Sequence, residues 1–378
     1  MQTNNLEKEW YHITNISEID SPALVIYKDR VIQNIKTAIA MVGDPDSYQD
    51  RLRPHVKTHK TKEAAQLMMD AGINKFKCAT IAEAEMLAMI NAPDVLLAYQ
   101  PIGPKLKRFI TLIKKYSATK FSCLVDNIYS AKSIAEAATE NDIEIKVYID
   151  LNIGMNRTGL APGSEAIELY TTCKNVKGIQ AIGLHAYDGH IRTIDVSQRT
   201  IECDEAFKAV TEMQQQLQQK GFDKPIIIAG GSPTFPVHAK REEVECSPGT
   251  FVYWDKTYLN YTEQHFIPAA LVIARIISLP DDTKLCIDLG HKSISSENEL
   301  SNRVYFLNAP ALKFISHSEE HLVAEAQPGH AYKAGDILYG LPVHICPTCA
   351  LYERAHIVQN NKVTAEWKMI ARDRKINV

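Results

Sequence analysis

Lys57 lies between two histidines in the segment 53–60, RPHVKTHK, and could act as a Schiff-base lysine. In an extended chain alternate side chains share a face, so His55, Lys57 and His59 would point the same way. A lysine that is removed from water beside cationic groups loses its proton more easily, and the neutral amine can attack an aldehyde. A solvated basic loop is the alternative for an isolated lysine. The two flanking histidines favour the functional interpretation.

A possible phosphate-binding loop contains Gly230, Gly231, Ser232 and Thr234 in the sequence GGSPT. Glycines let the backbone come close to a ligand, and the two hydroxyl groups add hydrogen-bond donors. An ordinary Gly-Gly turn is the alternative when the loop is considered alone. Together with a Schiff-base lysine, the loop indicates a phosphorylated aldehyde, and pyridoxal phosphate is the commonest cofactor of that kind.

The elements that must position these groups alternate between strands and helices through the first two-thirds of the chain. Short β-branched runs predict strands, and the amphipathic stretches between them predict helices. The expected strands are 22–27, 51–57, 75–80, 94–100, 120–126, 143–150, 179–187 and 225–230, and the expected helices include 62–70, 81–90, 105–115, 128–139 and 199–219. Eight strands favour an α/β fold built as a (β/α)8 TIM-type barrel over a doubly wound open sheet, which usually has fewer strands.

The C-terminal ends of the strands form the active site in such a barrel. Besides Lys57 and the loop 230–234, those ends would present the segments 150–159, DLNIGMNRTG, and 185–190, HAYDGH. A single polar residue at such a place is more often structural than catalytic. Four polar clusters at the strand ends of one barrel predict a single functional rim.

The pattern changes after residue 253, where strands are separated by turns and no helix is expected between them. The expected strands are 269–279, 284–289, 303–307, 312–315, 321–326, 336–341 and 355–359. Such a run of strands and turn signals is typical of an all-β domain. We therefore predict a barrel domain at 21–255 and a second, all-β C-terminal domain at 265–378, on which residues 1–20 would pack.

The composition argues against several kinds of partner. Lys and Arg number 42 against 45 Asp and Glu, and no basic block is present, so neither a nucleic-acid partner nor an anionic membrane surface is expected. No apolar run is long enough to span a bilayer, and the polar N-terminus is unlike a signal peptide. The 8 cysteines are too scattered for a disulfide framework. We expect a soluble, cytoplasmic enzyme.

The segment around Lys57 resembles the cofactor-lysine segment of the D-threonine aldolase and D-serine dehydratase family, which are alanine-racemase-like, fold-type III pyridoxal-phosphate enzymes. GMNRTG at 154–159 is similar to a motif of that wider group, GGSPT is similar to its phosphate loop, and the match extends over most of the chain. The resemblance implies a barrel with a β domain, a homodimer, and a small D-amino acid as the substrate.

The same resemblance implies roles for individual residues. Lys57 would hold the cofactor and move the Cα proton, Arg157 would lie against the pyridine ring, and Tyr187 would lie near the cofactor. Thr80 ends the expected strand 75–80, where contacts with the phosphate or the ring are expected. An arginine cannot give the ring nitrogen a proton, because its own pKa is very high. The ring would then be a weak electron sink, so the reaction would need further electrophilic help.

A metal ion could give that help at His344 and Cys346, which are two residues apart in LPVHICPTC at 341–349. In extended backbone both side chains would project from one face and could bind one ion. Alone the pair is a weak signal, and Cys346 also forms a CxxC motif with Cys349 that lacks a thioredoxin-like context. The resemblance implies one divalent ion at this motif. The family's dehydratases resemble this His-x-Cys form and use zinc, whereas its aldolases are associated with manganese or magnesium; a thiolate favours zinc.

The expected function is a lyase that uses pyridoxal phosphate and a divalent metal on D-3-hydroxy amino acids. His190 in HAYDGH resembles the aldolase branch and is the candidate base, which favours D-threonine aldolase, giving glycine and acetaldehyde. Cys346 favours the alternative, D-serine dehydratase, giving pyruvate and ammonia. A racemase would need a second base, commonly a β-domain tyrosine, to which we find no clear match. A non-catalytic pyridoxal-phosphate carrier resembles a bare barrel, which the second domain argues against.

Overall fold

The computed structural model describes residues 9–43 and 48–378. The chain divides into two units, which are described separately. The barrel unit comprises Lys36–Lys57, Lys62–Gly249 and Asp373–Val378, and the sheet unit comprises the described residues up to Ile35, Thr58–Thr61 and Thr250–Arg372. Within the described parts of the chain, no helix has the length and apolar character needed to cross a membrane.

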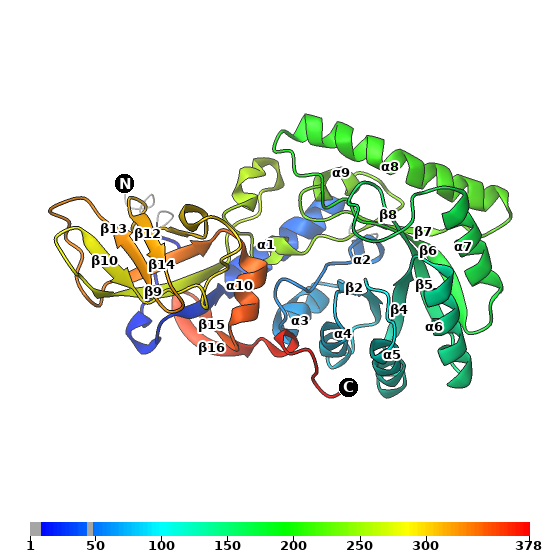
Figure 1. Cartoon of the computed structure of the whole chain (residues 1–378), viewed down its shortest axis with the longest axis horizontal. Coiled ribbons are helices and arrows are strands. Elements are labelled where there is room, and N and C mark those ends of the chain that lie inside the picture. Colours follow the sequence, from blue (N-terminus) through cyan, green and yellow to red (C-terminus); the bar gives the residue numbers. More distant parts are fainter. Residues whose placement is uncertain (1–8, 44–47) are drawn as a thin grey trace. The chain divides into compact units, whose positions relative to one another are not determined.

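A curled sheet of parallel strands forms the centre of the barrel unit (Figure 1). In both spatial and chain order the strands are β2 (Lys75–Cys78), β3 (Asp94–Leu97), β4 (Lys120–Val125), β5 (Ile145–Leu151), β6 (Ile179–Ala186), β7 (Ile226–Ala229) and β8 (Val244–Cys246). Residues 52–56 link the two outer strands, because Leu52 bridges to Cys246 and His55 bridges to Lys77, both in parallel. The expected strand 51–57 therefore becomes a pair of isolated bridges that complete the predicted barrel.

Helices follow most of these strands and lie outside the curled sheet (Figure 1). The helices of the barrel unit are α2 (Tyr48–Arg51), α3 (Lys62–Asp70), α4 (Ile81–Ala88), α5 (Pro104–Lys115), α6 (Ile128–Glu140), α7 (Ser164–Asn175), α8 (Val196–Gln219) and α9 (Phe235–His238), and α1 (Lys28–Val42) begins in the sheet unit. Side chains cap several of them: Asn127 accepts from the Ser130 backbone N–H, and Asp195 accepts from that of Gln198. The five predicted helices are confirmed.

The sheet unit contains one mixed sheet, whose main path runs β12-β13-β10-β9-β1-β15-β16. β14 also pairs with β9, and β11 pairs with β14. The strands are β1 (Ala23–Tyr27), β9 (Ala270–Ser278), β10 (Lys284–Ile287), β11 (Val304–Phe306), β12 (Lys313–His317), β13 (Leu322–Glu325), β14 (Ile337–Pro342), β15 (Arg354–Gln359) and β16 (Lys362–Lys368). Ile13 and Ile19 are buried in the core of this unit with Val25 and Leu271, whereas residues 1–8 of the expected N-terminal segment lie outside the described residues.

Two expectations about these elements are wrong. The segment 22–27 does not open the barrel, because β1 pairs antiparallel with β9 and parallel with β15, and β8 takes the remaining barrel position. All five residues of β1 are buried, and a short apolar run of that kind fits the interior of either sheet. The C-terminal region also contains a helix, α10 (Ile345–Leu351), where only strands and turns were expected.

An ionic cluster around the buried Arg53 lies at the N-terminal end of the barrel strands, where β2 and β3 begin. Arg53 is 1% exposed and donates to Glu245 and to Asp94, each at 2.6 Å. Lys75 reaches the other carboxylate oxygen of Glu245 at 2.7 Å. A buried charge must be met by partners, since removing one partner leaves the other charge in a low-dielectric environment. Glu245 therefore holds the linking segment 52–56 and β2 together.

We expect Glu245→Gln to lower the free energy of unfolding by about 3–5 kcal/mol, because it removes the buried carboxylate and leaves the buried Arg53 with Asp94, whose side chain is 33% exposed. Urea denaturation followed by circular dichroism measures the loss. Glu243→Gln is the matched control, because the Glu243–Lys224 pair is 67% and 41% exposed on its two side chains. That variant should lose no more than about 0.5 kcal/mol. Equal losses for the two variants would contradict the structural role of Glu245.

Candidate functional site

Three cations surround the ring of Tyr187 in the barrel unit. Lys57 Nζ lies 5.9 Å from the ring centroid, Arg157 Cζ lies 5.1 Å away and Lys77 Nζ lies 5.7 Å away. Lys57 follows the linking segment, Tyr187 directly follows β6, and Arg157 lies in the loop after β5. The structure thus brings together three of the predicted site residues, Lys57, Tyr187 and Arg157, and places Lys77 beside them.

The Tyr187 ring lies in space that the side chains of larger residues at positions 189 and 231 would occupy. A Cβ atom on Gly189 would lie 2.3 Å from the tyrosine hydroxyl, and a Cβ atom on Gly231 would lie 3.2 Å from the ring. Gly154, in the loop after β5, has a φ of +124°. A Cβ atom at this position would lie 2.4 Å from the exposed His190 ring. His190 therefore lies against the loop that carries Arg157, within the segment predicted to form the rim.

The loop 230–234 uses both of its hydroxyl groups within the protein. Thr234 is fully buried, accepts from the Gly231 backbone N–H at 3.2 Å and donates to Asp188 at 2.8 Å. Ser232 accepts from the backbone N–H of Gly249 at 3.3 Å. These bonds fix the shape of the loop, and phosphate binding by the loop stays a prediction.

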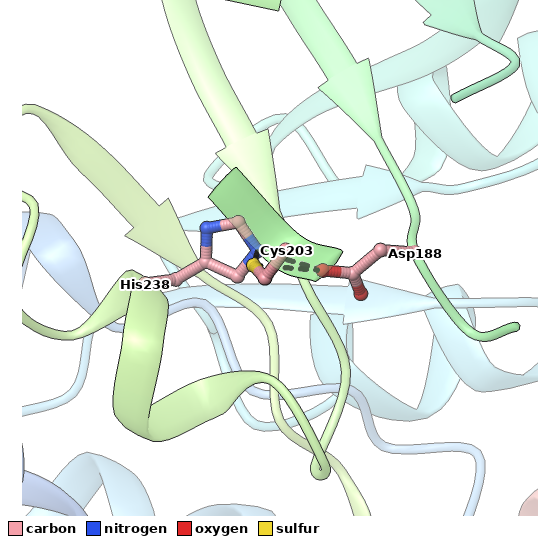
Figure 2. A group of neighbouring side chains, drawn as sticks. All are labelled: Asp188, Cys203 and His238. Atoms are coloured by element: carbon pink, nitrogen blue, oxygen red, sulfur yellow. Dashed lines mark hydrogen bonds and ion pairs between the residues drawn. The ribbon is translucent and has the colours of Figure 1, made fainter. Parts of the chain in front are cut away.

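Asp188 is also the centre of a buried cluster with Cys203 of α8 and His238 of α9, whose side chains are turned toward one another (Figure 2). Asp188 and His238 are 2.8 Å apart, and the Cys203 sulfur lies 3.4 Å from His238 and 3.7 Å from Asp188. Among the described residues, this set has the composition and spacing of a metal site. The sequence prediction did not include it.

Hydrogen bonding argues for a structural cluster here. Arg241 Nη1 lies 2.6 Å from His238 Nδ1, and an arginine can only donate, so Nδ1 accepts. The proton of the neutral ring is then on Nε2, where it is donated to Asp188. Histidines that ligate metals usually have an acceptor, not an arginine, at the second nitrogen. The cluster therefore braces Asp188 beneath Thr234 and the loop 230–234.

A second buried histidine presents an unused nitrogen inside the barrel. His185 Nδ1 lies 2.8 Å from Asp150, whereas the buried Nε2 atom has no hydrogen-bond partner among the described residues. Burial lowers the pKa of His185, and the charges of Lys77 and Arg157 lower it further. Asp150 raises this pKa but does not offset the other effects. A neutral ring with its proton on Nδ1 leaves Nε2 as an acceptor for a bound polar group.

Thr80 has a different local role. Its hydroxyl accepts from the Glu83 backbone N–H at 3.1 Å and caps α4. Thr80 also lines a cavity of about 330 Å³ with Lys105, Arg108 and other residues. None of its described contacts involves Tyr187 or the loop 230–234, so a role for Thr80 at the cofactor stays a prediction.

His344 and Cys346 lie side by side in the sheet unit, and each has an additional polar neighbour. Glu297 contacts His344 Nδ1, and the Thr58 hydroxyl lies 3.1 Å from the Cys346 sulfur. Although burial opposes it, hydrogen bonding and charge from Cys346 and Glu297 raise the pKa of His344 to about 9. The two neighbours therefore stabilise the protonated, positively charged form of the His344 ring.

The pair converges by a route that the sequence prediction did not include. His344 is the extended N-cap residue of α10, and Cys346 lies in the first turn of that helix. The expected extended backbone through Cys346 is therefore wrong, although the two side chains do meet. Asp255 holds this junction, since its carboxylate accepts from the Ile345 backbone N–H at 3.0 Å.

The residues present fit both groups that the sequence implies. The barrel offers three basic side chains around one ring, of which Lys57 supplies the amine, and a His185 nitrogen without a partner among the described residues. This set suits an anionic aromatic aldehyde such as pyridoxal phosphate. The His344 nitrogen and the Cys346 sulfur lie together, and the His344 side chain is 38% exposed. These features suit an open divalent site of the zinc type.

Comparison with known proteins agrees with this organisation. Residues 26–257 match the family described as alanine racemase, N-terminal domain, and residues 269–358 match the putative serine dehydratase domain. A D-threonine aldolase from Arthrobacter sp. is 25% identical over 365 residues, covering 94% of each chain. The crystal structure of D-threonine aldolase from Filomicrobium marinum superposes with a TM-score of 0.86 at 24% identity, covering 94% of this chain and 96% of that one.

A dehydratase is similar to the same extent. The D-threo-3-hydroxyaspartate dehydratase of Delftia sp. strain HT23 is 25% identical over 390 residues, covering 93% of this chain and 97% of its own. A cysteine-to-alanine mutant of an enzyme of that name, solved in the metal-free form, has a TM-score of 0.80 at 21% identity, with 93% and 97% coverage. The predicted resemblance is confirmed: the chain belongs to the alanine racemase N-terminal-domain family and joins that domain to a putative serine dehydratase domain.

Proposed function

We propose that this protein is a lyase that uses pyridoxal phosphate and one divalent metal ion to cleave D-3-hydroxy amino acids, with D-threonine as the substrate and glycine and acetaldehyde as the products. The observation that supports this most directly is the convergence of Lys57, Arg157 and Lys77 on the Tyr187 ring. Relatives of both kinds, aldolase and dehydratase, support the wider class of lyases on D-hydroxy amino acids.

Pyridoxal phosphate, when bound, supplies the electron sink that makes bonds to Cα breakable. Lys57 provides the amine that binds its aldehyde carbon and can afterwards carry a proton. Tyr187 and Arg157 orient the aromatic ring, and the glycines at 189 and 231 allow Tyr187 to stay in that position. These side chains lie on strand ends and on loops directly after them, so the strands fix their positions.

His190 is the candidate base for aldol cleavage. It is exposed, and it lies against Gly154 in the loop that carries Arg157. A neutral histidine there can accept the proton of the substrate hydroxyl, which cleavage of the Cα–Cβ bond requires. His190 therefore favours the aldolase reaction over the dehydratase reaction.

The second candidate function is D-serine dehydratase, and Cys346 is the observation that favours it. A divalent ion supplies a Lewis acid, and a thiolate ligand favours zinc over manganese or magnesium. In that reaction Lys57 would remove the Cα proton, and pyruvate and ammonia would form. His344, Cys346 and the neighbouring carboxylate of Glu297 would hold the ion in either reaction. A homodimer, which the family resemblance implies, belongs to the same proposal.

Incubation with D-threonine, D-serine and their L-forms tests the proposal when pyridoxal phosphate and Zn²⁺ or Mn²⁺ are present. We expect glycine and acetaldehyde from D-threonine only, and His190→Gln should slow their formation by about 100-fold while pyridoxal phosphate still binds. Pyruvate from D-serine as the main product would transfer the assignment to the dehydratase. Epimers without cleavage would favour a racemase, and spectral change without any product would favour a carrier.

Lys57 should be the residue that binds the cofactor covalently. Borohydride reduction with pyridoxal phosphate, followed by peptide mapping, should locate the adduct on Lys57. Lys57→Ala should abolish the adduct, and Lys60→Ala should retain it as the control. An adduct on Lys60 or Lys62 in the wild type would contradict the assignment.

Cys346→Ala should lose the bound metal and at least about 100-fold of the lyase activity, while the absorbance of bound pyridoxal phosphate stays unchanged. Elemental analysis measures the metal content. Cys349→Ala is the matched control, since Cys349 lies one turn later on the same helix and is fully buried. Chelation should remove the ion without lowering the unfolding temperature greatly, because an open site contributes little to folding. Normal metal content in Cys346→Ala would refute this site.

A further inference from the structure

Lys77 is a lysine in the interior of the barrel. It is 3% exposed and lies in β2, where both faces of a parallel sheet are normally apolar. Its backbone N–H donates to Pro54 and its carbonyl accepts from Val56, each at 2.9 Å. The position of Lys77 is therefore fixed beside the segment that ends in Lys57.

The Lys77 ammonium lacks a counter-charge within the described structure. No described acceptor lies within hydrogen-bond or ion-pair distance of its Nζ. The acids whose charges act on it are Asp188 and Asp150. Asp188 already accepts from His238 and Thr234, and Asp150 accepts from His185 and Gln100. A buried cation without a partner is costly, so a folded protein keeps one mainly where something else binds it.

The neighbouring charges make this position suitable for an anion. Burial first, and Lys57 second, lower the pKa of Lys77 to about 7, with Arg53 acting in the same direction and Asp188 and Asp150 opposing. An anionic oxygen beside Nζ would restore the proton to the amine. The charge would then be met by the ligand and not by the protein.

Lys77 also shares its surroundings with the other ligand-facing groups. Its Nζ atom lies 5.7 Å from the centroid of the Tyr187 ring, which Lys57 and Arg157 also approach. His185, whose Nε2 atom has no described partner, is close enough for the charge of Lys77 to lower its pKa. One donor and one acceptor thus lack partners in the same part of the barrel.

We infer that Lys77 is a ligand-binding residue of the barrel site, whose ammonium binds an anionic oxygen of the group that Lys57 holds or of the substrate attached there. This inference rests on the proposed function. The oxygen belongs either to the aromatic ring of pyridoxal phosphate or to the carboxylate of the D-amino acid. Both sources share the chemistry of a charge-assisted N–H···O bond.

The test uses Lys77→Met, which keeps an unbranched side chain, one heavy atom shorter, and removes its charge. Titration of the apoprotein with pyridoxal phosphate at pH 7 gives the dissociation constant of the cofactor, and titration of the loaded protein with D-threonine gives that of the substrate. If the ring oxygen is bound, the first constant should rise by about tenfold or more. If the carboxylate is bound, only the second should rise by that factor. Lys77→Arg should restore part of either loss.

Thermal unfolding of the apoprotein separates this role from a structural one. Because Lys77→Met removes an unpaired buried charge, its unfolding temperature should equal or exceed that of the wild type. A lower unfolding temperature would show that Lys77 is structural and would overturn the inference. Lys146→Met is the control: Lys146 is an exposed lysine of β5 in the same unit, so both dissociation constants should stay within about twofold.

Borohydride trapping distinguishes the failure of this inference from the failure of the proposed function. If the wild type and Lys77→Met both give the Lys57 adduct and both constants agree within twofold, the inference is wrong and the proposed function stands. If the wild type gives no adduct with pyridoxal phosphate, the proposed function is wrong and the inference falls with it.

Discussion

The ion pair between Arg53 and Glu245 is the interaction on which the barrel site depends. Arg53 lies on the segment that links the outer strands β8 and β2, and its guanidinium is buried against carboxylates from β8 and β3. Backbone hydrogen bonds to Cys246, Pro248 and Lys77 attach that segment through isolated bridges and not through a continuous strand. The buried charges make the attachment specific. Lys57 lies four residues beyond Arg53, so its position follows from this pair.

Charge is distributed unevenly between the two ends of the barrel interior. At the end where β2 and β3 begin, Arg53 and Lys75 form ion pairs with Glu245 and Asp94. Around Tyr187, the carboxylates of Asp188 and Asp150 bind histidines and hydroxyl or amide groups. Lys57 and Lys77 have no ion-pair partner among the residues that the structure describes. A protein without a ligand gains nothing from such an excess of cations. The imbalance is understandable if the site binds an anion.

Periodicity identified most elements because parallel strands and amphipathic helices repeat strongly. β3 to β7 and α3 to α6 lie where their apolar patterns predict them. The assignment of β1 failed, since a fully buried five-residue run has no polar face to show which sheet covers it. β8 has only three residues and was missed. Sequence patterns fix local structure more firmly than they fix the partners of a short strand.

Some residues of the candidate site belong to sequence motifs and could be proposed from the sequence, whereas others can be recognised only from their surroundings in the structure. Lys57, Tyr187 and Arg157 belong to recognisable segments and meet around one ring. Lys77 has no such motif, because KFKC looks like a strand with one wet face. The signal was available in principle: in a parallel barrel both faces of β2 are covered, so a lysine in the middle of that strand is anomalous.

His344 and Cys346 show that two side chains can meet as expected even though the local structure expected for them is wrong. Spacing of two residues brings side chains together in a strand, but His344 and Cys346 meet at a strand-to-helix junction. His344 has extended backbone at the N-cap, Cys346 lies in the first turn of α10, and a hydrogen bond joins the two side chains. Asp255 accepts from the Ile345 N–H and fixes that change of direction. The backbone at this junction, and not the spacing in the sequence, determines where the His344 nitrogen and the Cys346 sulfur lie. The geometry of a bound ion would therefore depend on the junction and on Asp255 as well as on these two side chains.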